Sequence, residues 1–142
     1  MLNTLMTNGA YRIDYFECTT GGEGKTFGFY VRGEPTATDA YSRDAKSQLY
    51  AGLMLIHSRL GMKNLRGVYV DVDRVENLER PAYKQLKADL VSGLFKTVFA
   101  LEETALLGSS ATRLDLQQVY RLCGGFEFIV CKEGVCAPAQ LF

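Results

Sequence analysis

Short apolar segments alternate with helix-forming segments along most of this 142-residue chain. Residues 27–32, 67–71, 94–101 and 126–131 are rich in aromatic and β-branched residues, and we predict that they form strands. Their nearly continuous apolar character indicates burial on both faces of a sheet. Because a helix pattern separates each strand from the next, parallel pairing with right-handed crossovers is expected. The sequence therefore predicts a three-layer α/β domain with a central, mostly parallel sheet.

The helices between these strands are identified by their spacing and by their ends. Residues 42–60 carry apolar residues at helical spacing, and a glycine follows as a stop. Pro81 suits the first turn of a second helix, which Gly93 is expected to end. The third helix is capped by Ser109 or Ser110 and ends at a Gly-Gly pair.

The N-terminal region adds one more strand to this pattern. Residues 11–18 are rich in aromatic and β-branched side chains, and a glycine-rich loop follows them. We expect this strand at an edge of the sheet. The chain is accordingly divided into an N-terminal strand and loop extension, residues 1–26, and an α/β domain, residues 27–142.

The composition narrows the possible functions. Sixteen basic and sixteen acidic residues give no net charge, so charge alone does not predict nucleic-acid binding. No apolar run is long enough to span a membrane, and the N-terminus lacks the pattern of a leader, so we expect a cytoplasmic protein without membrane contact. The four cysteines, Cys18, Cys123, Cys131 and Cys136, show no zinc-site spacing with the single histidine and are expected to be reduced. Cys123 and Cys131 are expected to be buried structural thiols, and His57 a packing or surface residue.

Charged residues follow the predicted strands in a distinctive order. The first strand leads into Tyr30-Val31-Arg32-Gly33-Glu34, the second ends at Asp71, Arg80 begins the next helix, and Glu102-Glu103 follows the third strand. This order and spacing over residues 27–131 resemble the N-terminal catalytic domain of serine recombinases, the resolvase/invertase family. The resemblance implies a resolvase-like fold in which the strand at 27–32 lies between those at 67–71 and 94–101.

The same resemblance implies that the catalytic residues of that family are missing. Its nucleophilic serine is replaced by Glu34, and its Asp-Arg-Leu-x-Arg signature by Glu102, Glu103 and Leu106. Only Arg32, Asp71 and Arg80 match the family site. Without a nucleophile and with fewer cationic donors for the phosphate, no strand cleavage is expected.

The function implied by the resemblance is that of a catalytically inactive resolvase-like domain, a binding or regulatory module linked to DNA recombination or a mobile element. Expected partners are DNA, bound weakly, or a recombinase or other protein, and a homo-oligomer is possible; no cofactor is expected. Residues 132–142 are too few for a helix-turn-helix after the last strand.

The acidic residues also permit an alternative function. Glu34 and the Asp71-Val72-Asp73 segment resemble the magnesium-binding acids of Toprim domains, although Pro35 stands where that family has glycine. Oxygen-rich sites favour Mg²⁺. The alternative is therefore a magnesium-dependent phosphotransfer or nuclease domain that uses Glu34, Asp71 and Asp73 as metal ligands.

Overall fold

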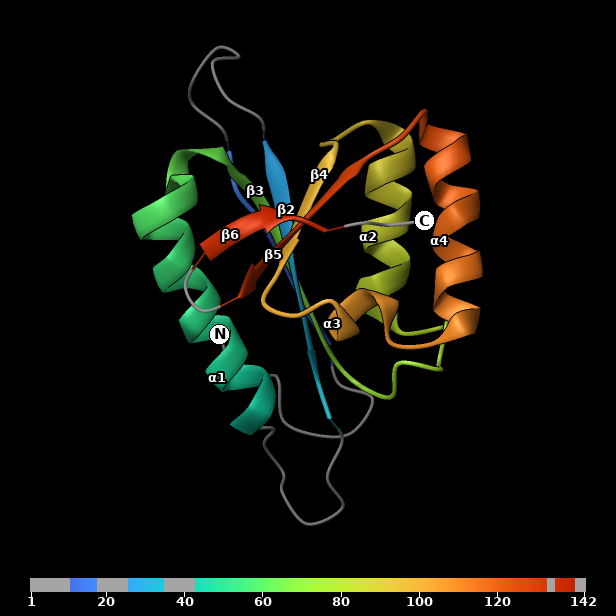
Figure 1. Ribbon diagram of the computed structural model, residues 1–142, viewed down its shortest axis with the longest axis horizontal. Coiled ribbons are helices and arrows are strands. Elements are labelled where there is room, and N and C mark those ends of the chain that lie inside the picture. The colour runs from blue at the N-terminus through green and yellow to red at the C-terminus, as the bar shows by residue number, and fades with distance from the viewer. Residues whose placement is uncertain (1–10, 18–25, 35–42, 133–134, 140–142) are drawn as a thin grey trace.

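A six-stranded sheet with the order β1-β3-β2-β4-β5-β6 forms the centre of the molecule (Figure 1). The computed structural model describes residues 11–17, 26–34, 43–132 and 135–139. The strands are β1 (Tyr11–Tyr15), β2 (Phe27–Gly33), β3 (Leu65–Val72), β4 (Thr97–Ala100), β5 (Glu127–Lys132) and β6 (Val135–Pro138). No helix in these ranges is both long enough and apolar enough to cross a membrane.

Strand pairing confirms the predicted sheet and adds one strand to it. β2 pairs in parallel with both β3 and β4, and β4 pairs in parallel with β5. β1 lies at one edge and is antiparallel to β3, as expected for an N-terminal edge strand. β6 forms the other edge, antiparallel to β5, and was not predicted. The third predicted strand, 94–101, is shorter in the structure, because only Thr97–Ala100 joins the ladder.

Local sequence signals determine where the helices begin and end. Pro81 occupies the first turn of α2 (Pro81–Ser92), and Gly93 ends it in the left-handed conformation. The Ser109 side chain accepts a hydrogen bond from the backbone N–H of Thr112 and so caps α4 (Ser110–Cys123). The helix predicted at 42–60 is α1 (Arg43–Leu55) followed by a π-helical turn, η2 (Ile56–Leu60). Two short helices were not predicted, η3 (Met62–Asn64) and α3 (Thr104–Leu107).

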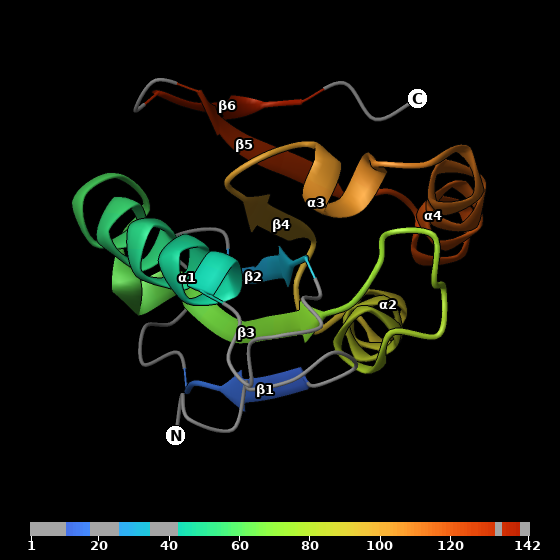
Figure 2. The ribbon, with the colours of Figure 1, turned by 90° about the horizontal axis from the view of Figure 1, so that it is seen from below.

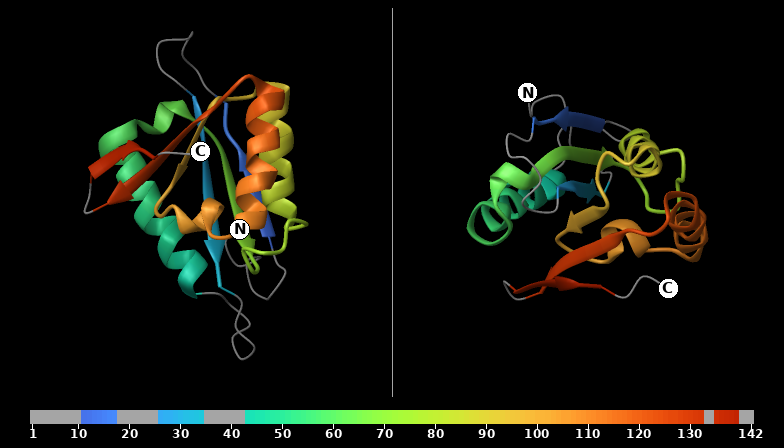
Figure 3. Two further views of the ribbon diagram at one scale, coloured as in Figure 1. Left: turned by 45° about the vertical axis from the view of Figure 1, so that its right-hand side comes forward. Right: turned by 90° about the horizontal axis from the view of Figure 1, so that it is seen from above.

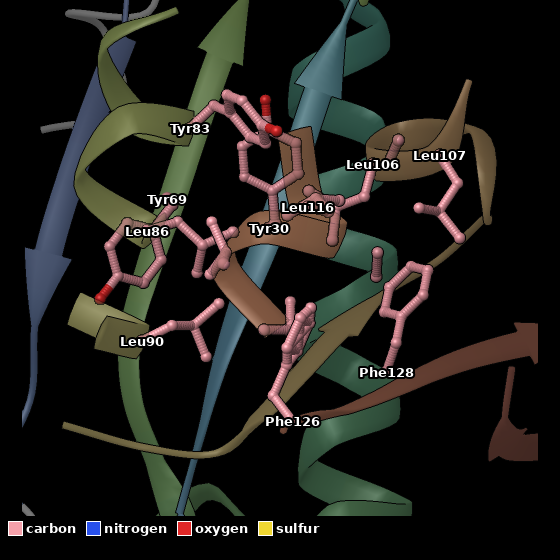
Figure 4. Packing of buried hydrophobic residues seen from close by; sticks show 14 of the residues in the cluster. Tyr30, Tyr69, Tyr83, Leu86, Leu90, Leu106, Leu107, Leu116, Phe126 and Phe128 are labelled. Carbon is pink, nitrogen blue, oxygen red and sulfur yellow. The ribbon is translucent and has the colours of Figure 1, made fainter. Parts of the chain in front are cut away.

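Helices cover both faces of the sheet, which confirms the three-layer architecture. α1 lies on one face, and α2, α3 and α4 lie on the other (Figures 2 and 3). The alternation of side chains along β3 divides them between two cores. Val68, Val70 and Val72 join the cluster under α1, whereas Tyr69 joins the cluster under α2 and α4 (Figure 4). The burial of each such valine side chain contributes about 1.5–3 kcal/mol to the free energy of folding.

Helix α1 approaches the sheet closely because a glycine faces it. A Cβ atom at Gly52 would lie 2.0 Å from Cζ of the Phe29 ring, so no larger residue fits without displacing that ring. Phe29 in turn packs against Phe99 of β4, with ring centroids 5.3 Å apart. This contact holds α1 against β2 in the middle of the sheet, and the Gln48 side chain of α1 donates to the backbone carbonyl of Arg32 near the end of the same strand.

Candidate functional site

Asp71 lies near the carboxyl end of β3 and is completely buried. Its Oδ1 atom accepts the backbone N–H of Ala82 at 2.9 Å. Its Oδ2 atom accepts the backbone N–H of Tyr83 at 2.9 Å and the hydroxyl of Tyr30 at 2.8 Å. Asp71 therefore satisfies N–H groups in the first turn of α2 that have no partner within the helix, and its negative charge lies at the positive end of the helix dipole.

Arg80 is the buried cation beside this carboxylate, with no exposed side-chain surface. Its Nε atom donates to the Tyr30 hydroxyl at 3.0 Å and lies 3.8 Å from Oδ2 of Asp71. The guanidinium stacks 4.3 Å from the centroid of the Tyr83 ring. Its Nη1 atom donates to three backbone carbonyls of the preceding loop, those of Arg74, Val75 and Asn77. Through these contacts Arg80 anchors the loop between β3 and α2.

Burial and hydrogen bonding shift the pKa of the Asp71 carboxyl in opposite directions. Burial raises the pKa of Asp71, whereas the N–H groups of Ala82 and Tyr83, the Tyr30 hydroxyl and the Arg80 charge lower it. Burial is the largest of these effects, so the net pKa of Asp71 is raised. Asp71 therefore belongs to a structural network with Tyr30 and Arg80, which we call the Asp71 network.

A second, polar group surrounds Arg32 at the end of β2. The Arg32 side chain is 9% exposed, and its Nη1 atom donates to Oε1 of Glu34 at 2.8 Å and to the carbonyl of Asp73 at 3.1 Å. Glu102 accepts a hydrogen bond from the Thr104 hydroxyl. A pocket of about 190 Å³ opens here, lined by Arg32, Glu34, Gln48, Glu102, Thr104 and Ala105. We call it the Arg32 pocket.

The residues matched to the recombinase site are thus divided between two places. Arg32, Glu34 and Glu102 line the Arg32 pocket, while Asp71 and Arg80 are buried under α2. Glu103 precedes α3, and its backbone carbonyl accepts the N–H groups of Leu106 and Leu107. Leu106, which stands at a signature arginine, is buried in the core under α2 and α4. The expected acids do follow the carboxyl ends of their strands, but their side chains do not form one cluster.

The acids of the magnesium alternative are not assembled either. Among the described residues, no group of three or more His, Cys, Asp or Glu side chains is placed to hold a metal ion. The Asp73 carboxylate instead accepts the backbone N–H of Arg74 and the side-chain amide of Asn77. Asp71 is buried under α2, and Glu34 is paired with Arg32.

Sequence reasoning missed the polar residues that surround Arg80. Tyr83 donates from its hydroxyl to Oδ2 of Asp115 at 2.7 Å, and Lys87 donates to the same oxygen at 2.7 Å. The Lys87 ammonium also lies 4.5 Å from the centroid of the Tyr83 ring. The contact between Tyr30 and Asp71 follows from the strand register. Tyr30 lies opposite Tyr69, and alternation along β3 places Asp71 on the same face as Tyr69, so Tyr30 and Asp71 share that face.

The Asp115 contacts predict an acid-sensitive contribution to stability. Burial by itself raises the pKa of Asp115, but the hydrogen bonds from Lys87 and Tyr83 and the nearby cations outweigh it, so the net pKa is lowered. A carboxylate with a lowered pKa in the folded state adds stability above its ordinary value of 3.8, and this stability is lost as pH falls through the folded-state pKa. Asp115→Asn should therefore lower the free energy of unfolding by about 1 kcal/mol at neutral pH, and by less in acid.

Urea titrations of both proteins between neutral and acid pH measure this difference. Glu79→Gln is the matched control, because its pair with Lys84 is solvent-exposed and should contribute about 0.5 kcal/mol or less. If the decrease in the free energy of unfolding caused by Asp115→Asn stayed constant down to strongly acid pH, the charge of the Asp115 carboxylate would contribute nothing to stability.

No protein-family model matches this chain, and no curated protein does. Among solved structures, the chain is similar to the crystal structure of the N-terminal catalytic domain of TP901-1 integrase. The TM-score is 0.56 and the sequence identity 22%, over 79% of this chain and 81% of the integrase domain. This similarity and the strand order described above show that the chain has the α/β fold of that domain.

Proposed function

We propose that this chain is a catalytically inactive resolvase-like domain that acts as a binding or regulatory module in DNA recombination or on a mobile element. One observation carries the proposal. Glu34 stands where the resemblance places the nucleophilic serine, and its carboxylate is paired with the neighbouring Arg32 at 2.8 Å. A carboxylate at this place repels a phosphodiester and occupies the guanidinium that would otherwise bind it.

The environment of Arg80 supports the same proposal. Phosphoryl transfer requires cationic donors that reach the phosphate oxygens as charge develops on them. Arg80 is completely buried, and its hydrogen bonds go to Tyr30 and to backbone carbonyls. The loss of one preorganised donor costs about a hundred- to a thousand-fold in rate. Two signature arginines are replaced by Glu103 and Leu106, and the nucleophile is missing as well.

The proposed partners follow from the charge and the fold. With no net charge on the chain, its contact with DNA would be weak at physiological salt, because non-specific affinity comes from neutralised phosphates. A partner protein, such as a recombinase or a second copy of this chain, is therefore the principal ligand that we propose. The TP901-1 integrase domain is itself described as catalytic, so the proposed loss of activity distinguishes this chain from that neighbour.

The proposal predicts that the purified protein neither cleaves DNA nor becomes covalently attached to it. Supercoiled plasmid and end-labelled duplex DNA would be incubated with the protein, with and without Mg²⁺, and analysed on denaturing gels. An active serine recombinase serves as the positive control. Glu34→Ser restores a hydroxyl at the nucleophile position, and it should remain inactive because Glu103 and Leu106 still replace the arginines.

Two outcomes would contradict the proposal in different ways. A magnesium-independent protein–DNA adduct of the unmodified chain would show that a nucleophile survives. Nicking that requires Mg²⁺ and disappears in Glu34→Gln and Asp73→Asn would instead support the metal-dependent phosphotransfer alternative.

A further inference from the structure

Two cysteines face each other across the C-terminal hairpin. Cys131 of β5 and Cys136 of β6 are direct partners in the antiparallel register. Both side chains are partly buried and pack against the core cluster under α1.

The ladder shows which kind of pair they form. Antiparallel partners alternate between hydrogen-bonded and non-hydrogen-bonded pairs. The backbone N–H of Ala139 donates to the carbonyl of Phe128 at 2.8 Å, so the ladder is hydrogen-bonded at that position. Counting along the register from there, Ile129–Pro138 is a non-hydrogen-bonded pair, and so is Cys131–Cys136. Pro138, which has no N–H to donate, agrees with this assignment.

This position suits a disulfide. In a non-hydrogen-bonded pair the two Cα atoms are about 4.5 Å apart, and the side chains are closer than in a hydrogen-bonded pair. A disulfide requires Cα atoms about 4.4–6.8 Å apart. A pair of this kind in the β5–β6 ladder therefore falls within the Cα separation that a disulfide requires.

We propose that Cys131 and Cys136 are a redox-active pair that closes into a disulfide in the presence of an oxidised low-molecular-weight disulfide. A thiolate of the pair attacks one sulfur of the reagent, whose S–S bond breaks and releases one reduced thiol. The second cysteine then attacks the protein sulfur of the mixed disulfide and releases the other reduced thiol. The protein loses two electrons and two protons, and the reagent gains them.

The consequence of this bond falls on β6. Three of the four residues of β6 are exposed, and only Cys136 is partly buried, so the strand depends on its ladder to β5. β6 covers the backbone edge of β5, and an uncovered strand edge is a template for pairing with another chain. The disulfide therefore holds the edge of the sheet covered, whereas reduction lets β6 open more readily.

The two thiols should undergo thiol–disulfide exchange at a moderate rate. Burial raises the pKa of the Cys136 thiol and the neighbouring Cys131 acts in the same direction, whereas Arg59 of η2 acts against both. Because the thiolate is the attacking species, exchange is expected to be faster in mildly alkaline buffer.

The test uses oxidised glutathione and the tryptic map of the full chain. Lys132 lies between the two cysteines, so trypsin separates them unless a disulfide joins their peptides. A variant with Cys18→Ser and Cys123→Ser retains only the proposed pair, and most of its molecules should yield the linked peptide. The matched control adds Cys136→Ser and should yield none. Hydrogen exchange of residues 135–139 should slow by on the order of tenfold on oxidation.

Three results would overturn the proposal. The first is a chain that remains fully reduced in excess oxidised glutathione. The second is the accumulation of glutathione adducts or covalent dimers in place of the internal bond. The third is a linked peptide without slower hydrogen exchange in residues 135–139, which would show that the bond does not hold β6.

Discussion

Arg80→Met is expected to lower the free energy of unfolding by about 3–5 kcal/mol, since removal of one partner leaves the other charge buried and uncompensated. The substitution keeps most of the side-chain volume but removes the donor to Tyr30 and to the carbonyls of the preceding loop. It also removes the cation stacked on the Tyr83 ring. Urea unfolding followed by circular dichroism measures the effect. The free energy of unfolding of Arg80→Lys should lie between those of the unmodified protein and Arg80→Met, because an ammonium keeps the charge but lacks the planar fork of donors.

Arg74→Met is the control for this prediction. Arg74 lies in the same loop but is exposed, so its replacement should change the free energy of unfolding by about 0.5 kcal/mol or less. If Arg80→Met were as stable as the unmodified protein, Arg80 would not fasten the loop.

Asp71→Asn is the second substitution with a large expected effect, a loss of about 3 kcal/mol or more in the free energy of unfolding. Both carboxylate oxygens accept hydrogen bonds, from the N–H groups of Ala82 and Tyr83 and from the Tyr30 hydroxyl. An asparagine amide replaces one acceptor with a donor, so donor faces donor at the start of α2. The buried Arg80 charge also loses its counterion.

A double-mutant cycle tests whether Asp71 and Arg80 act as one unit. In the variant carrying both Asp71→Asn and Arg80→Met, the decrease in the free energy of unfolding should be about 1–3 kcal/mol smaller than the sum of the two single decreases, because the double variant buries no unpaired charge. Asp73→Asn is the control, since Asp73 is only partly buried and its bonds lie in the loop. Additive losses from Asp71→Asn and Arg80→Met would refute the network.

These two predictions give a physical reason for retaining Asp71 and Arg80 without catalysis. Both residues fall at family site positions only under the resemblance, whereas their hydrogen bonds directly join the loop and α2 to β3. Arg32 and Glu34 instead pair with each other at the edge of a small polar pocket. Under the proposed function, residues with a structural role remain, while those that serve only the reaction have been replaced.

Much of the fold could be predicted from local patterns. The apolar strands, Pro81, Gly93 and the Ser109 cap act within a few residues, so their effects are visible in the sequence. β6 and α3 were missed because each is only four residues long and too short to show a period. The strand expected at 94–101 was too long in the prediction, since an apolar run marks burial and does not show where the ladder begins.

The sequence by itself predicted the layered architecture and, through the family resemblance, the central position of β2. Only the tertiary structure decided which matched residues meet. The register places Arg32 directly opposite Asp71. The side-chain contacts separate their charged groups, because the Asp71 carboxylate accepts hydrogen bonds from Tyr30 and the first turn of α2, while the Arg32 guanidinium pairs with Glu34 at the pocket. The same register places Cys131 opposite Cys136. Such pairings depend on how strands align, and a one-residue change in register would reverse the face of every side chain.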